Sequence, residues 1–257
     1  MTKIDVTYAN HVQQRLAVAQ DVYKDISTDV LPGGWHRTAD STQTMGHGNG
    51  LFAAVYERTV SDNPEYMIAF RGLDDWRDID DIAKIKFGGL PQQVFNALAF
   101  SQNIAHKHGV ELSSMSFTGH SLGGYLARAI GMVAQSSDII AFNSPGLYRN
   151  DVAPLDTLRK NFNSMAPSIT AAEIEQRVQN FNAKDDLVSR FGQLRGTVMR
   201  IPTEDGSPHS INTLGRSFVA FFMGGESPPA APTQTAAAQP ASPPPFWARR
   251  ATPGLAV

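Results

Sequence analysis

The residues best suited to covalent chemistry lie in Gly119-His120-Ser121-Leu122-Gly123-Gly124, a G-x-S-x-G motif with a further glycine behind it. The preceding residues 115–118 are typical of a buried strand, and an amphipathic helix pattern follows, with apolar residues at Leu122, Leu126, Ile130 and Val133. A serine between a strand and a helix is the context of a nucleophile elbow, and its tight turn needs glycines on both sides. We therefore predict Ser121 as a nucleophile and the backbone N–H of Leu122 as an oxyanion donor. A glycine-rich turn without chemistry is the less favoured alternative.

A serine hydroxyl is a poor nucleophile unless a base lies beside it and a carboxylate orients that base. In α/β-hydrolases the acid and then the histidine follow the serine along the chain. Of the seven histidines only His209 follows Ser121, so we predict it as the base. Asp185 and Asp186 both come just after a predicted strand, at the edge of the sheet where catalytic groups gather, and either fits as the acid.

The other aspartates after Ser121 fit less well as the acid. They precede a strand, lie in a polar connection or stand very close to His209 in the sequence: Asp138, Asp151, Asp156 and Asp205. A second oxyanion donor is expected from the loop after an earlier strand, where Leu73 has a suitable backbone N–H.

The elements that must position these residues alternate between strands and helices. Helical patterns cover residues 8–27, 91–109, 122–133 and 211–222, and a polar helical connection with a capping box at Thr170 and Glu173 precedes residue 177. Strand patterns cover residues 51–56 and 66–71, expected to pair as a hairpin, and residues 115–118, 138–143, 177–183 and 197–201. Residues 28–50 are predicted to be a loop. The alternation predicts an α/β fold with a mostly parallel central sheet and helices on both faces.

The bulk composition excludes several classes of function. The formal net charge is −2, which gives no electrostatic footprint for nucleic acid, and the 257 residues include no cysteine, so thiolate chemistry and disulfides are excluded. Residues 74–81 contain five carboxylates but lack the ligand spacing of a calcium loop, so we expect a solvated surface and no metal site. The predicted chemistry needs neither a metal nor an organic cofactor.

The chain divides into a predicted domain over residues 1–223 and a Pro/Ala-rich tail over residues 224–257, which we expect to be disordered. Within the tail, residues 246–250 combine aromatic and basic side chains, so a short docking or membrane-surface motif is the alternative to an unstructured end. The first five residues lack the apolar segment of a signal peptide. By default we expect a cytoplasmic protein, with export by another route left open.

The motifs together resemble those of the class 3 lipases, and among them the bacterial branch of lipase-like phospholipases. The elbow matches the family's G-H-S-L-G-G in full. The remaining matches are Ile68-Ala69-Phe70-Arg71-Gly72 with the F-R-G strand, Trp76 and Asp80 with W-x-x-x-D, Phe142-Asn143-Ser144-Pro145-Gly146 with F-N-x-P-G, Asp186-Leu187-Val188 with D-x-V, and His209-Ser210 with H-S. The resemblance spans residues 51–221.

This resemblance implies an α/β-hydrolase fold and a lipase or phospholipase A activity on acyl esters of lipids, with transient contact to a membrane surface. It implies Asp186 as the acid, the N–H of Leu73 in the oxyanion hole, and substrate contacts from His120 and Trp76. The branch includes toxins that bacteria deliver through secretion machines, which is one route of export without a signal peptide.

Two departures from the family concern the oxyanion hole and the lid. Leu73 replaces the usual Thr or Ser, which removes a hydroxyl from the oxyanion hole, and the short interval from Leu73 to Trp76 leaves little room for a helical lid. The shortened lid favours soluble esters or phospholipids over triglycerides. The alternatives are a small-ester esterase, a thioesterase or a peptidase on the same triad, and a hydrolase-fold binding protein without turnover.

Overall fold

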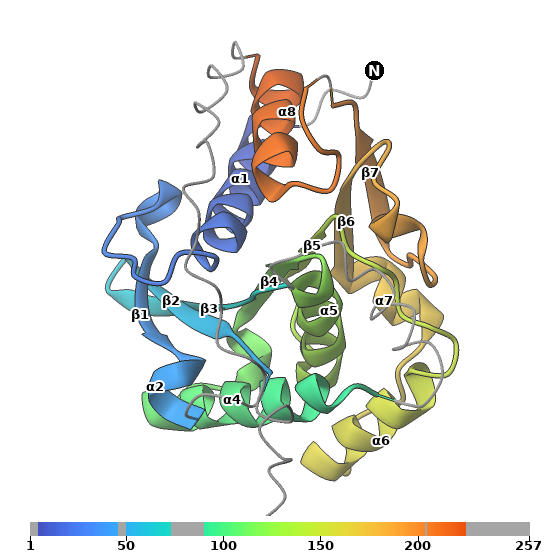
Figure 1. Ribbon diagram of the computed structural model, residues 1–257. Helices are drawn as coiled ribbons and strands as arrows, with labels where there is room; N and C mark the ends of the chain where they lie inside the picture. Colours follow the sequence, from blue (N-terminus) through green and yellow to red (C-terminus); the bar gives the residue numbers. More distant parts are fainter. Residues whose placement is uncertain (1–4, 46–49, 73–89, 204, 225–257) are drawn as a thin grey trace, which may run out of the picture. The chain divides into compact units, whose positions relative to one another are not determined.

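The computed structural model describes residues 5–45, 50–72, 90–203 and 205–224. A seven-stranded sheet lies at the centre of this described part (Figure 1). The strands lie side by side in chain order. Pairs β1–β2 and β2–β3 are antiparallel, and all pairs from β3 to β7 are parallel. The bounds are β1 (His36–Asp40), β2 (Ala53–Val60), β3 (Asn63–Phe70), β4 (Ser116–His120), β5 (Ile139–Phe142), β6 (Val178–Ala183) and β7 (Thr197–Ile201). The predicted hairpin and the mostly parallel sheet are confirmed.

Helices cover both faces of this sheet, as predicted (Figure 1). One face carries α4 (Gln92–His108), α5 (Leu122–Ala134), α6 (Val152–Phe162) and α7 (Ala171–Arg177), and the other carries α1 (Val6–Asp21) beside α8 (Ile211–Met223). Neighbouring residues of β5 show the two sides, because Ile139 packs with the first group of helices and Ile140 with the second. The short elements are α2 (Ser41–Met45), η1 (Pro32–Gly34), η4 (Leu112–Ser114) and η5 (Val188–Arg190).

The helix ends follow the signals in the sequence. Pro91 precedes α4, and Gly109 ends it with a φ of 64°, the predicted order of proline at the start and glycine past the end. Thr170 accepts the backbone N–H of Glu173 at 3.1 Å, which is half of the predicted capping box. The Glu173 carboxylate does not return to the cap, because it pairs with the guanidinium of Arg159.

The predicted loop over residues 28–50 is wrong, because this segment contains β1 and α2. As the edge strand, β1 pairs with one neighbour only, and its polar residues need no apolar alternation. Arg37 pairs with the buried carboxylate of Asp21 at 3.0 Å and also donates to the Asp21 carbonyl. This contact ties β1 to α1, and α1 ends at Asp21, before the predicted end at residue 27. Asp40 accepts backbone N–H groups two and three residues on, where α2 begins.

Helix α8 ends at Met223 and is capped by Gly224 with a φ of 63°. Residues 225–257 lie outside the described residues, so the domain boundary and the disorder of the tail stay predictions. In the described ranges no helix is long and apolar enough to cross a bilayer.

An ion pair joins α1 to the amino-terminal edge of the sheet. The Asp138 carboxylate accepts from Arg15 at 2.5 and 3.1 Å and from the Ser116 hydroxyl at 2.8 Å, and it lies 3.1 Å from the His11 ring. Burial raises the pKa of Asp138, but the His11 hydrogen bond and the Arg15 charge outweigh it and hold that pKa well below its usual range. Asp138 therefore has a structural partner, at the edge opposite to the one where β4 ends at His120, just before Ser121.

Replacing Arg15 by Met should lower the free energy of unfolding by about 3 kcal/mol, because a largely buried carboxylate loses its cationic partner while the aliphatic stem is kept. The matched control is Lys160→Met, which removes the exposed pair with Asp156 at 2.8 Å and should cost less than about 1 kcal/mol. Urea denaturation at pH 7 measures both values. Equal losses in the two variants would contradict the structural role of Asp138.

Candidate active site

Ser121 lies on the turn between β4 and α5 with a φ of 57° and a ψ of −129°, a conformation that residues with a side chain rarely adopt. Its N–H donates to the Phe142 carbonyl at 3.0 Å, and its own carbonyl accepts the N–H groups of Gly124 at 3.0 Å and Tyr125 at 3.3 Å. These bonds fix the backbone on both sides of the serine. The result is the sharp strand–turn–helix of a nucleophile elbow.

The glycines of the motif allow this turn because they stand where backbones meet. A Cβ on Gly123 would lie 1.9 Å from the Phe70 carbonyl oxygen at the end of β3, and one on Gly119 would lie 2.4 Å from the Gly123 carbonyl. Both neighbours are backbone atoms of the packed sheet and helix, which cannot give way. Any side chain at either position would push α5 off the sheet.

The structure brings Ser121, His209 and Asp186 together. His209 follows β7 on the loop before α8, and its Nε2 lies 3.0 Å from the Ser121 Oγ. Its Nδ1 lies 2.8 Å from Asp186 Oδ1, on the loop after β6. With Nδ1 donating to the carboxylate, the lone pair of Nε2 faces the serine hydroxyl. This arrangement can remove the serine proton during attack on a carbonyl carbon.

Asp186, and not Asp185, reaches the histidine. The Asp186 side chain is fully buried, and it also accepts the backbone N–H groups of Val188 at 3.3 Å and Ser189 at 2.9 Å. Asp185 is exposed. The His209 side chain is 13% exposed, whereas that of Asp186 is fully buried.

The oxyanion side is described in part. Leu122 begins α5, so its N–H belongs to the first turn, where helical N–H groups lack partners within the helix. Gly72 lies against the elbow, since a Cβ there would come within 2.9 Å of the Ser121 Cβ. Leu73 follows Gly72 in the sequence, but Leu73, Trp76 and the acidic residues 74–81 lie outside the described residues. Among all the described residues there is no group of three or more His, Asp or Glu side chains that could hold a metal ion.

His120 is buried beneath the serine and uses both ring nitrogens within the protein. Nδ1 lies 2.9 Å from the Tyr23 hydroxyl, and Nε2 lies 2.7 Å from the backbone carbonyl oxygen of His209. Burial, and then the nearby His209, lower the pKa of His120 to about 3. The His120 ring is therefore neutral and hydrogen-bonded within the protein, whereas the resemblance implied a contact between His120 and the substrate.

Two residues of this site were missed as functional candidates. Tyr23 lies just past α1 and matches the apolar spacing of a helix face, so the sequence indicates only a core residue. Asn143 stands in the Phe142–Gly146 motif, which could have drawn attention to it. Its amide donates to the carbonyls of Pro208 at 2.9 Å and His209 at 3.3 Å and accepts the Ala183 N–H at 2.7 Å.

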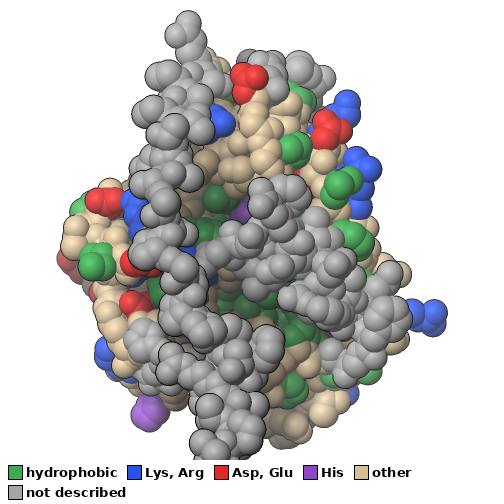
Figure 2. Space-filling model, in the orientation of Figure 1, with side chains coloured by type: hydrophobic (Ala, Val, Ile, Leu, Met, Phe, Trp, Pro, Cys, Tyr) green, Lys and Arg blue, Asp and Glu red, His purple; other side chains and the backbone are tan. Residues whose placement is uncertain are grey.

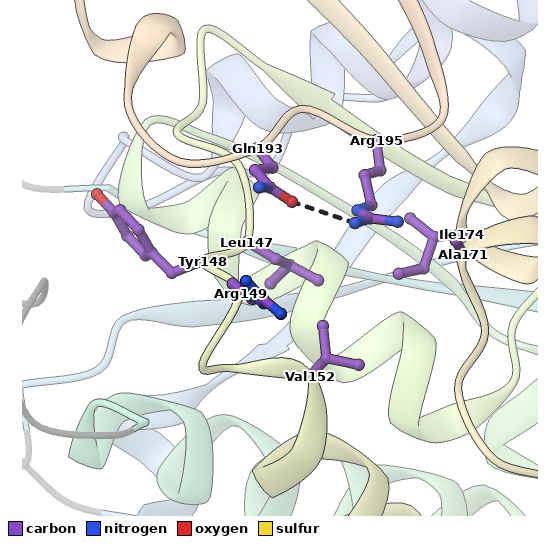
Figure 3. Close-up of a pocket in the computed structure, with 8 residues that line it drawn as sticks. All are labelled: Leu147, Tyr148, Arg149, Val152, Ala171, Ile174, Gln193 and Arg195. Atoms are coloured by element: carbon purple, nitrogen blue, oxygen red, sulfur yellow. Dashed lines mark hydrogen bonds between the residues drawn. The ribbon is translucent and has the colours of Figure 1, made fainter.

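A cavity of about 210 Å³ lies apart from this triad, lined by Leu147, Tyr148, Arg149, Val152, Ala171, Ile174, Gln193 and Arg195 (Figure 3). Arg195 donates to the Gln193 side chain there at 3.2 Å, and the Tyr148 ring points away from the other lining side chains. The space-filling view shows a histidine at the surface near the middle of the face, among hydrophobic side chains (Figure 2). The triad residues are not among those that line the cavity.

Residues 11–216 match the Tle-like phospholipase domain, which is described as phospholipase-like. The chain belongs to this family. The match confirms the resemblance to lipase-like phospholipases and supports an ester hydrolase of phospholipase-like type.

Two solved structures are similar to this chain. EstE1, a thermophilic and thermostable carboxylesterase cloned from a metagenomic library, is 11% identical with a TM-score of 0.37, and the alignment covers 85% of this chain and 96% of that chain. Esterases of the fungus Rhizomucor miehei give 10% identity and a TM-score of 0.29, with 87% of this chain and 93% of that chain covered. The search of the curated proteins found no match to this chain.

The buried His120 predicts an acid-sensitive fold. Its pKa is about 3 in the folded protein and near 6.5 when unfolded, so between these values the unfolded state binds more protons and stability falls as the pH falls below about 6.5. We expect protonation of His120 in the unfolded state to lower the free energy of unfolding by on the order of 1 kcal/mol per pH unit in this range. The His120→Gln variant should not show this part of the decrease. Urea midpoints of both proteins at pH 7, 6 and 5 test it, and parallel decreases would contradict it.

Proposed function

We propose that this chain is a serine ester hydrolase that cleaves fatty acyl esters of phospholipids, a phospholipase A activity, through an acyl-enzyme on Ser121. The observation that carries the proposal is the pair of contacts from His209, 3.0 Å to the Ser121 Oγ and 2.8 Å to Asp186. The family supports a phospholipid as the substrate.

In the proposed reaction the Ser121 Oγ attacks the ester carbonyl while His209 Nε2 takes the hydroxyl proton. Asp186 stabilises the imidazolium that forms, and the N–H of Leu122, together with that of Leu73, holds the oxyanion. The C–O bond to the lysophospholipid breaks as His209 returns the proton to the leaving alcohol. Water, activated by the same histidine, then hydrolyses the acyl-serine and releases the fatty acid.

The triad itself does not select phospholipids over other esters. A small-ester esterase, a thioesterase and a peptidase would use the same groups, and a binding protein could keep the fold without turnover. We favour the phospholipase because the family description names that class. Transient contact with a membrane surface follows from a substrate that is presented in a bilayer.

We expect the wild type to release fatty acid from phosphatidylcholine or phosphatidylethanolamine vesicles, and Ser121→Ala and His209→Ala to lose roughly 10⁴-fold or more in kcat. Triolein and a short p-nitrophenyl ester serve as comparison substrates, with release followed by titration and absorbance. Turnover of the short ester alone would move the assignment to an esterase. A folded wild type that turns over no ester would support the binding protein instead.

The neighbouring aspartates provide a matched pair for the acid. Asp186→Asn should lower kcat by about 10⁴-fold, because an amide does not hold the histidine in the tautomer that accepts the serine proton. Asp185→Asn makes the same chemical change one residue away, on an exposed side chain, and should leave kcat within about twofold. Rates of short-ester hydrolysis for the two variants decide between them, and a larger loss in Asp185→Asn would reverse the assignment.

A further inference from the structure

The backbone carbonyl of the catalytic-base candidate is held from two sides. His120 Nε2 lies 2.7 Å from the His209 oxygen, and the Asn143 amide donates to the same oxygen at 3.3 Å. The two rings also face each other, with centroids 4.8 Å apart and planes inclined by 37°. His120 therefore contacts His209 through both its backbone and its ring.

The chemistry of these contacts sets the direction of each hydrogen bond. A carbonyl oxygen only accepts, so His120 must carry its proton on Nε2. In the neutral ring Nδ1 is then an acceptor, and the Tyr23 hydroxyl, 2.9 Å away, donates to it. The Tyr23 oxygen in turn accepts the backbone N–H of Gly72 at 3.0 Å. One tautomer of one buried histidine satisfies the whole chain of bonds.

The two ends of this chain lie at two different parts of the site. One end is the loop that carries His209, and the other is Gly72, which packs within contact distance of Ser121 and immediately precedes Leu73. The Tyr23 ring meets the His120 ring edge-on at a centroid distance of 5.8 Å, and the Arg71 guanidinium lies 5.5 Å from the Tyr23 ring. Tyr23 thus contacts both the end of β4, at His120, and the residues that directly follow β3.

We propose that His120 and Tyr23 are positioning residues that hold the base loop and the Gly72 segment in register around Ser121, an inference that rests on the hydrolase proposed above. His120 fixes the backbone of His209 so that Nε2 of His209 stays in line with the Ser121 hydroxyl. Tyr23 fixes the tautomer of His120 and accepts the N–H of Gly72. This assignment replaces the substrate contact predicted for His120, which is 6% exposed and has both nitrogens bonded.

Two amide variants separate the functions of the two nitrogens. In His120→Gln the side-chain N–H₂ lies near the position of the imidazole Nε2 and can still donate to the His209 carbonyl. In His120→Asn the shorter side chain places its amide near the position of Nδ1, so residue 120 no longer donates to that carbonyl. For a short ester, we expect kcat to fall by no more than about threefold in His120→Gln and by about tenfold or more in His120→Asn. KM should be unchanged in both variants. Equal losses, or a loss confined to KM, would overturn the proposal.

Tyr23→Phe should lower kcat several-fold in the wild-type background and by a smaller factor in the His120→Gln background, where Nδ1 is already absent and only the contact with the Gly72 N–H is left to lose. Such non-additivity is the mark of two residues that act as one unit. The matched control is Tyr8→Phe, which also removes a hydroxyl hydrogen bond, 2.6 Å to the Gln179 side chain, at a distant part of the fold, and should leave kcat unchanged. Additive losses from Tyr23→Phe would overturn the coupling.

A spectroscopic readout tests the tautomer without turnover. In ¹⁵N-histidine-labelled protein, the His120 signals, assigned by their loss in His120→Gln, should show protonated Nε2 and unprotonated Nδ1 from pH 8 to pH 5, and Tyr23→Phe should shift Nδ1. A ring protonated on Nδ1 would overturn the proposal directly.

The rate of Ser121 labelling by a fluorophosphonate separates the two proposals. A wild type that neither labels nor hydrolyses any ester overturns the proposed function and the positioning role with it. A reactive wild type whose Tyr23→Phe and His120→Asn variants label equally fast overturns the positioning role alone.

Discussion

The turn at Ser121 is the constraint on which the rest of the site depends. A serine at a φ of 57° costs about 1–3 kcal/mol and persists only where its surroundings hold it. Here they are α5, which is buried along its whole length, and the sheet against which it packs through Gly119 and Gly123. The burial of one apolar helix thus offsets the strain of one residue. The same packing presents the serine at the edge where the parallel strands end.

Parallel strands explain how distant residues meet at that edge. Consecutive strands from β4 to β7 end on the same side, so the loops that follow them converge, and His209 meets Ser121 across 88 positions of sequence. The loop after β5 contributes Asn143, whose amide links the His209 loop to the end of β6, from which the chain runs on to Asp186. The geometry of the triad is therefore a property of the sheet, and each loop needs only a short anchor to complete it.

The parts of this arrangement that sequence could predict are those with a local signal. Apolar periodicity and the Pro and Gly at helix ends indicated α4, α5 and the parallel strands correctly. Strand β1 was missed because an edge strand with satisfied polar side chains has no apolar alternation. The choice between Asp185 and Asp186 needed a family motif, since neighbouring residues point in different directions and the residue types are identical. The tautomer of His120 had no signal at all, because it is set by Tyr23 and His209, which are far away in sequence.

The neutrality of His120 connects the stability of the fold to its chemistry. In the proposed reaction His209 takes the serine proton, and a positive charge develops on a ring whose centroid is 4.8 Å from that of His120. A charged His120 would repel it and would lose Nδ1 as the acceptor for Tyr23, so two requirements of the proposed reaction demand the neutral form. Burial supplies that form by lowering the pKa to about 3, and the cost is a fold that loses stability in acid. The site therefore places its two histidines in different environments: the His209 side chain is partly exposed beside Ser121, and His120 lies in the interior, where its two hydrogen bonds hold one tautomer.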